Sequence, residues 1–326
     1  MRVFLIIWGG QLLSLIGSGL STFALGVWVY DQTGQATPFA LTVLFGSLPW
    51  VLLAPLAGAV ADRWNRRLIM IVADSGSALL TLLIAVMLFL APGGLQIWHI
   101  YLISVVGSAF GVFQEAAYQP SVTMLVPKEQ FGRASGLMQT GHALRGIISP
   151  LLAGVLYVSI GLEGILIIDF ASYFFAIGAL LLVRIPQPEP VAGEGTEERS
   201  ILEDMVYGWH YLLKRTPLLV MLLYYALVNF LLAFTTVLIT PLVLSFSPAS
   251  VLGAVHAAGS GGMLAGSLLM STWGGPPRKM NGVFAFIALF SLGFLLMGLG
   301  ESAVLIGLGT VSYTHLTLPT TIKPWG

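Results

Sequence analysis

Among the charged side chains inside long apolar stretches of the sequence, three stand out, namely Glu115, Arg145 and Asp169. A charge near the centre of a bilayer costs about 2.5–3.5 kcal/mol on insertion scales, so such residues usually face a partner or a water-filled path. A carboxylate in that setting can bind and release a proton. We therefore take these three residues as candidates for proton exchange within a membrane.

The pair of Glu115 and Arg145 allows two interpretations. As a proton-coupling group, Glu115 exchanges a proton and Arg145 stabilises its charged form. As a permanent ion pair, the same residues only hold two helices together. The substitution Glu115→Gln separates the two interpretations, because unchanged proton coupling in that variant would exclude the first.

Polar residues also form stripes on otherwise apolar helices, as from Gln11 to Ser18, where they recur every three to four positions. Such a stripe lines a shared hydrophilic cleft or lets membrane helices pack closely. Packing better explains serine and glycine, whereas the cleft better explains Gln11, Gln139 and Glu115. A single histidine such as His142 is more often a packed residue. The candidate residues of a substrate cleft are Gln11, Ser14, Ser18, Gln139, His142, Tyr225 and Asn229.

Long apolar helices are needed to hold these residues. The chain is 57% hydrophobic and 9% charged, whereas a soluble domain is usually about a quarter charged. We therefore expect an all-α, polytopic membrane protein, because a run of roughly 20 apolar residues can cross a bilayer as a helix. We predict nine complete spans, over residues 3–29, 38–61, 68–91, 97–119, 134–160, 163–183, 217–245, 250–273 and 281–299. A tenth begins near Ser302 and does not reach full length.

The lysines and arginines predict the orientation of these spans. Twelve of the 14 lie at the amino terminus or in the second, fourth, sixth and eighth loops, and the other loops hold none. Because positive residues are retained in the cytoplasm, we expect a cytoplasmic amino terminus. The first apolar run is too long for a signal peptide, so we expect a retained span.

A short charged loop, Gly58 to Arg67, stands between the second and third predicted spans, with the sequence GAVADRWNRR. A cationic turn between two apolar runs indicates a tight cytoplasmic loop, and this anchoring role needs only the arginines. The spacing also resembles the pattern G-x-x-x-D-R-x-G-R-R of the major facilitator superfamily, with Asn65 in place of the second glycine. The resemblance implies a gating role for Gly58, Asp62, Arg63, Arg66, Arg67 and Asp74.

Further segments resemble the macrolide-efflux and siderophore-exporter branch of that superfamily. They are FALGVWVYDQTG (23–34), MLVPKEQFGRASGL (124–137), IISPLLAGVLY (147–157) and LIIDFASYFFA (166–176). The resemblance implies twelve helices in two six-helix bundles, alternating access, and export of small amphipathic compounds such as macrolide-like drugs by proton antiport. A siderophore or another metabolite is the alternative substrate. A non-transporting membrane receptor or scaffold is the alternative from another class.

The predicted spans and loops divide the chain into four parts. We expect an N-terminal six-helix bundle over residues 1–185, a cytoplasmic linker with an amphipathic helix over 186–216, and a partial C-terminal bundle over 217–309. The loop from Gly274 to Lys279 echoes the position of the first charged loop. Residues 310–326 include VSYTHLTLPT, which resembles the in-frame translation of a sequencing-library adapter. We therefore expect a non-native tail and three missing helices.

Other protein classes find little support in the sequence. The net charge is zero, and no basic, aromatic-interleaved surface for nucleic acid is visible. The sequence contains no phosphate-binding loop, serine-hydrolase element or zinc-protease motif, so we expect neither an enzyme nor a cofactor or metal site. We expect a monomer in the lipid bilayer whose partners are its amphipathic substrate and protons.

Overall fold

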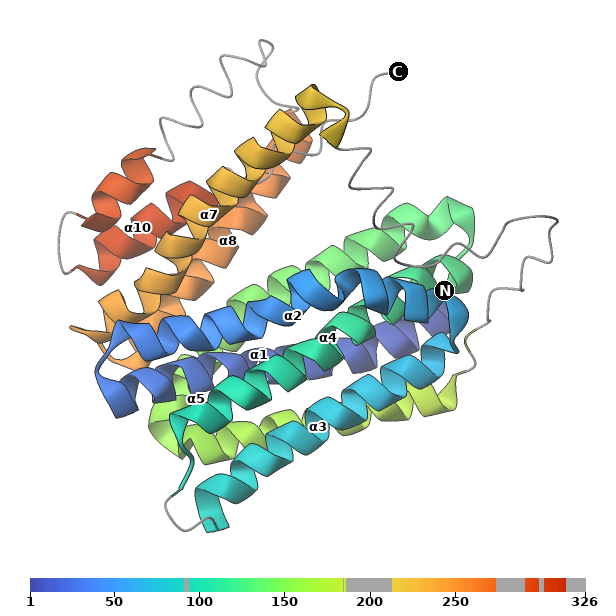
Figure 1. Ribbon diagram of the computed structural model, residues 1–326, viewed down its shortest axis with the longest axis horizontal. Helices are drawn as coiled ribbons and strands as arrows, with labels where there is room; N and C mark the ends of the chain where they lie inside the picture. The colour runs from blue at the N-terminus through green and yellow to red at the C-terminus, as the bar shows by residue number, and fades with distance from the viewer. Residues whose placement is uncertain (91–93, 184, 186–212, 274–290, 299–301, 315–326) are drawn as a thin grey trace. The chain divides into compact units, whose positions relative to one another are not determined.

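The computed structural model describes residues 1–90, 94–183, 185, 213–273, 291–298 and 302–314 (Figure 1). Within this part of the chain it contains helices and no strand, which confirms the all-α prediction. The helices are α1 (Arg2–Thr33), α2 (Ala36–Arg63), α3 (Arg66–Leu90), α4 (Ile97–Leu125), α5 (Phe131–Leu182), α7 (Thr216–Leu244), α8 (Ala249–Trp273) and α10 (Ala303–Thr314), with a 3-10 turn, Lys128–Gln130, before α5.

Five helical segments among the described residues are long and apolar enough to cross a membrane. They are Arg2–Thr33, Ala36–Arg63, Arg66–Phe89, Ile97–Leu125 and Lys128–Leu182. Apolar runs of this length become helices because lipid offers no partner for backbone polar groups, which must bond within the segment. The count of nine spans stays a prediction. Most of the predicted linker, and the loop from Gly274 to Lys279, lie outside the described residues.

Two predicted spans, 134–160 and 163–183, join directly in α5, which runs for 52 residues. The direction of the chain changes at Gly161, whose backbone is non-helical, with φ of 70° and ψ of −177°. Glycine adopts such a positive φ at little cost because it has no Cβ. One residue therefore takes the place of the short loop that the sequence predicted.

The chain divides into two compact units, and α1, α5 and α7 contribute residues to both. Unit 1 consists of Met1–Gly10, Gln35–Ala134 and Tyr173–Leu238. Unit 2 consists of Gln11–Gly34, Ser135–Ser172 and Ile239–Gly326. These two units do not test the predicted division into two bundles, a linker and a tail, which stays a prediction.

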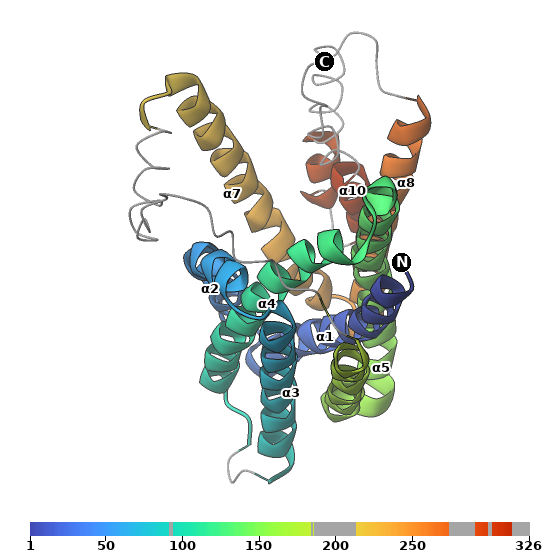
Figure 2. The same cartoon turned by 90° about the vertical axis from the view of Figure 1, so that its right-hand side faces the viewer.

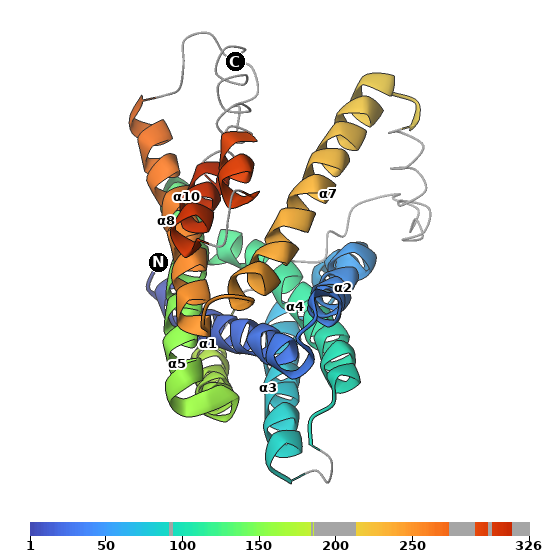
Figure 3. The same cartoon turned by 90° about the vertical axis from the view of Figure 1, so that its left-hand side faces the viewer.

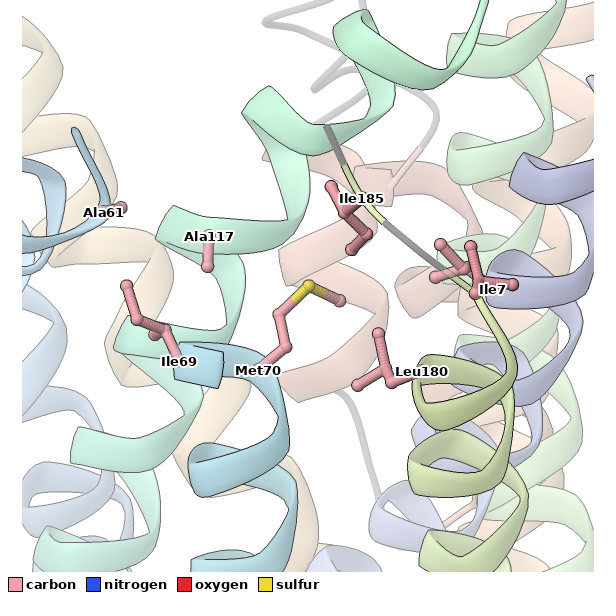
Figure 4. Close-up of a cluster of buried hydrophobic side chains, with 8 residues drawn as sticks. Ile7, Ala61, Ile69, Met70, Ala117, Leu180 and Ile185 are labelled. Carbon is pink, nitrogen blue, oxygen red and sulfur yellow. The ribbon is translucent and has the colours of Figure 1, made fainter. Parts of the chain in front are cut away.

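In unit 1, α2 and α3 both pack against α4, as Figures 1 and 2 show. An apolar cluster joins these helices to the first residues of α1 and to the end of α5 (Figure 4). Met70 and Leu180 are completely buried there. The chain beyond α5 continues into the same cluster through Val183 and Ile185, so the exit from α5 is fixed by apolar packing.

In unit 2, α8 packs against α10 (Figure 3). A second apolar cluster draws residues from α1, α7, α8 and α10 and from the described segment 291–298, which contributes Met297. The other members are Val27, Ile239, Val243, Ala249, Leu252, Val255 and Ile306. The helix α10 continues to Thr314 and so covers the first residues of the predicted tail. With 12 residues, α10 is shorter than the roughly 20 that cross a bilayer.

Candidate functional site

The guanidinium of Arg66 holds the charged loop together in unit 1. This residue is 7% exposed, and its Nε donates to the Ala61 carbonyl oxygen at 3.1 Å, at the end of α2. One terminal nitrogen forms an ion pair with Asp62 at 3.3 Å, and the other lies 3.2 Å from the Met124 sulfur, at the end of α4. A single cation thus connects the ends of two helices to the start of α3.

Asn65 stands where the family pattern has glycine, and the structure explains why asparagine suits this position. Its side-chain oxygen accepts a hydrogen bond from the Leu68 amide at 3.2 Å. Because α3 begins at Arg66, this contact is an N-cap, which typically contributes about 1 kcal/mol. The described structure shows no packing requirement for glycine at Gly58, since a Cβ added there would meet nothing within 4 Å. Asp74 is buried in α3.

Arg67 joins the beginning of α3 to the end of α5. Its Nε donates to the Leu180 carbonyl oxygen at 2.7 Å, and a terminal nitrogen donates to the Leu181 carbonyl oxygen at 2.9 Å. The last carbonyl groups of a helix have no partner within the helix and carry partial negative charge, so a cation stabilises them. The two adjacent arginines of the charged loop therefore hold different helix ends.

In unit 2, the polar stripe of α1 packs against α5. Ser149 donates to the Ile16 carbonyl oxygen at 3.0 Å. Ser18 donates to the Asp169 carboxylate at 3.3 Å. Ser14 is buried in the same stripe. These contacts are of the kind by which small polar residues bring membrane helices close together.

Two glycines permit an equally close approach between α5 and α8 in unit 2. A Cβ placed on Gly154 would lie 2.6 Å from the Ala249 carbonyl oxygen, and a Cβ on Gly253 would collide with the Pro150 carbonyl oxygen. The backbones of the two helices are therefore in direct contact. Larger side chains at these positions would separate them.

Helices α1, α7 and α8 meet around His256 in unit 2. The imidazole lies edge-on to the Phe23 ring, with centroids 6.0 Å apart and planes at 89°. Its Nε2 lies 3.4 Å from the Thr240 hydroxyl. This histidine therefore takes part in contacts between three helices.

The structure gives the predicted ion pair of Glu115 and Arg145 no direct support. Glu115 belongs to unit 1 and Arg145 to unit 2. The Glu115 carboxylate accepts a hydrogen bond from the Gln119 amide of its own helix at 2.6 Å. The pair stays a prediction.

The remaining candidate cleft residues do not form one described cluster. Gln11, Gln139 and His142 belong to unit 2, and the latter two are exposed. Asn229 belongs to unit 1 and is also exposed. The side chain of Tyr225 lies outside the description. Their role in binding a substrate stays a prediction.

The sequence reasoning did not single out the close contacts of α5. Gly146, Pro150 and Gly154 recur every four residues, which places small or compact residues on one face of a helix. That spacing is a known signal for close packing of membrane helices. The spacing identifies the face of α5 that makes the contact. The positions on α8 that contact this face are visible only in the structure.

Long apolar helices, with the polar residues gathered at helix ends and in helix contacts, define a multi-pass membrane protein. The family model of the Major Facilitator Superfamily matches residues 7–322. The chain belongs to this family of transporters.

Relatives agree with that assignment, and solved structures share the fold. Macrolide efflux protein A of Streptococcus pyogenes is 26% identical over 308 residues, which cover 91% of this chain and 73% of the relative. Macrolide efflux protein A of Enterococcus faecalis is 26% identical over 278 residues, which cover 82% and 81%. The nucleoside transporter NupG matches with a TM-score of 0.68 at 15% identity, over 97% of this chain and 79% of that one. This last likeness supports the fold alone.

Proposed function

We propose that the protein is a secondary active transporter that exports small amphipathic compounds by proton antiport and alternating access. It lies in the inner membrane of a bacterium with its amino terminus in the cytoplasm, an orientation that the loop charges support. Macrolide-like drugs are the proposed substrate class, because two relatives are named macrolide efflux proteins. Antibiotic resistance is the expected phenotype.

The observation that carries this proposal is the contact between early and late helices in unit 2. Alternating access needs such a contact, which closes one end of a transporter and later opens. The α5–α8 contact is built from glycine and backbone, through Gly154, Gly253 and the Pro150 carbonyl. Two helices whose contact contains no interlocking large side chains can separate and meet again without repacking those side chains. This contact is therefore suited to open and close repeatedly.

The charged loop supplies the complementary part of the mechanism. Arg66 ties the ends of α2 and α4 to α3, and Arg67 ties α3 to the end of α5. In the proposed cycle these contacts persist, so that the inner ends of four helices move as one piece. The opening then concentrates at the glycine contact.

Accumulation of a radiolabelled macrolide tests the function directly. A bacterium without its own macrolide pump would express the chain, and we expect it to hold less drug than cells with empty vector. A protonophore should restore the accumulation, since it removes the gradient that drives antiport. Unchanged accumulation, or a reduction that survives the protonophore, would contradict the proposal.

A further inference from the structure

The Asp169 carboxylate is 1% exposed and lies in the second part of α5, after the break at Gly161. A carboxylate removed from water is costly unless it is hydrogen-bonded, paired with a charge or neutralised by a proton. Its surroundings therefore decide which of these applies, and they include a hydroxyl donor and a tight helix contact.

The carboxylate lies directly in the contact between α1 and α5. The Ser18 hydroxyl of α1 donates to its Oδ1 at 3.3 Å. A Cβ added to Gly17 would lie 3.1 Å from the same oxygen and would collide with the Ser172 hydroxyl. The backbone of α1 thus passes against the carboxylate with no room for a side chain between them. A change of charge on Asp169 therefore acts on this helix contact at once.

Few ionisable groups share this contact. Residues 3–29 of α1 contain none, and the next on that helix are Tyr30 and Asp31, the latter of which accepts a hydrogen bond from Tyr157 at 3.0 Å. On the first part of α5, Arg145 passes close to α1, with its Cγ 3.2 Å from the position of a Cβ on Gly19. This arginine therefore reaches α1 one residue beyond Ser18.

Two further histidines belong to the same unit. His142 lies one turn before Arg145 on α5 and is exposed. His256 of α8 contacts Phe23 of α1. In the described part of unit 2, Asp169 thus combines a buried carboxylate with a direct contact between α1 and α5. Arg145 approaches the next residues of α1 from the first part of α5.

The surroundings of the Glu115 carboxylate differ from those of Asp169. The Glu115 carboxylate accepts a hydrogen bond from Gln119 on the same helix, at 2.6 Å, and the Glu115 side chain is half-buried. Protonation of Glu115 would change a contact within one helix, whereas protonation of Asp169 would change a contact between residues 151 positions apart. Coupling a proton to helix movement needs the second kind of contact.

We propose that Asp169, and not Glu115, is the carboxylate whose protonation is linked to the transport cycle, with Ser18 as its positioning residue on α1. The inference rests on the proposed function. In each cycle the carboxylate takes one proton from the water on one side and becomes a neutral carboxylic acid. It returns the same proton to the water on the other side, and no other bond changes. The neutral acid is a weaker acceptor for the Ser18 hydroxyl than the carboxylate, so the contact between α1 and α5 loosens.

Reconstituted full-length chain in lipid vesicles tests this assignment, with erythromycin as the transported probe. For exchange of one proton, a gradient of one pH unit supports at most about a tenfold substrate gradient. We expect the unmodified chain to approach this value. Asp169→Asn should reduce the substrate ratio to about one, the value without coupling, while exchange of labelled for unlabelled drug continues. Glu115→Gln should keep the gradient, and Glu163→Gln, on the same helix, is the control.

The outcomes separate the two proposals. If the unmodified chain builds no gradient, the proposed function fails. If the unmodified chain builds one and Asp169→Asn builds the same one, the assignment of Asp169 is overturned. A gradient that depends on sodium and vanishes in Asp169→Asn would also overturn the proton assignment.

A milder variant keeps the test valid if Asp169→Asn does not fold. Ser18→Ala removes one donor to the carboxylate, so the pH at which transport is half-maximal should rise, because the charged form loses a stabilising hydrogen bond. The infrared carbonyl band of the protonated acid should shift in the same variant. If neither the pH profile nor the band moves, Ser18 does not position the coupling group and the proposal is wrong.

Discussion

Replacing Gly253 by leucine should reduce transport about 5- to 150-fold while the chain still folds and binds its substrate. A Cβ at this position collides with the Pro150 carbonyl oxygen, and the rest of the side chain has nowhere to go while α5 and α8 stay in contact. Overpacking of this kind typically costs about 1–3 kcal/mol. This cost falls on the state in which α5 and α8 touch. It therefore shifts the equilibrium about 5- to 150-fold toward the state in which the contact is open.

The measurement uses the absence of native cysteines. Ser260→Cys on α8 should react with maleimide faster in the Gly253→Leu background, because the contact spends more time open. Gly261→Leu, on the same helix, is the matched control, since a Cβ there meets nothing within 4 Å among the described residues. Equal transport and equal maleimide rates in the two leucine variants would show that the glycine contact does not govern the cycle.

Removing the Arg67 side chain should loosen the end of α5. The variant Arg67→Ala loses hydrogen bonds to the Leu180 and Leu181 carbonyl oxygens. A hydrogen bond to a charged group contributes roughly 1.5–3 kcal/mol, and solvent screens the exposed Leu181 contact, so we expect a loss of about 1–3 kcal/mol in total. Hydrogen exchange at the end of α5 should accelerate about 5- to 150-fold.

Arg63→Ala is the control for this prediction, because Arg63 is an exposed cation of the same loop. Arg67→Lys keeps the charge but not the planar pair of donors, so its exchange rate should lie between those of the original chain and Arg67→Ala. If Arg63→Ala and Arg67→Ala accelerate exchange equally, the loop acts through its total charge and not through the helix-end contacts.

The helices and the charged loop were predictable because their causes are local. Apolar runs longer than the hydrocarbon core become helices in any arrangement, and a break at Gly161 follows from the freedom of glycine. The charged loop was visible as a cluster of arginines between two such runs. The cap at Asn65 was also accessible, since asparagine commonly precedes a helix.

The contacts between helices were not predictable in the same way. A periodic stripe identifies one face of a helix but not the helix that covers it. The sequence therefore placed Ser18 and Asp169 in separate roles, a cleft and a coupling group, although they share a hydrogen bond. The sequence also paired Glu115 with Arg145 from their charges and their places in neighbouring predicted spans, and this pair stays a prediction. The structure adds that the Glu115 carboxylate accepts a hydrogen bond from Gln119, one turn away on its own helix. Opposite charges identify an ion pair only when the two side chains are known to lie close together.

The most direct test of the account is a reversible lock across the α5–α8 contact. A Cβ at Gly146 would lie 3.2 Å from the Ser260 Cβ, close to the 3.5–4.5 Å of disulfide bonds, so a small adjustment lets Gly146→Cys and Ser260→Cys form one. We expect oxidation of this double variant to stop macrolide transport and a reductant to restore it, and we expect neither single variant to respond. Transport that continues at full rate with the disulfide formed would contradict alternating access through this contact.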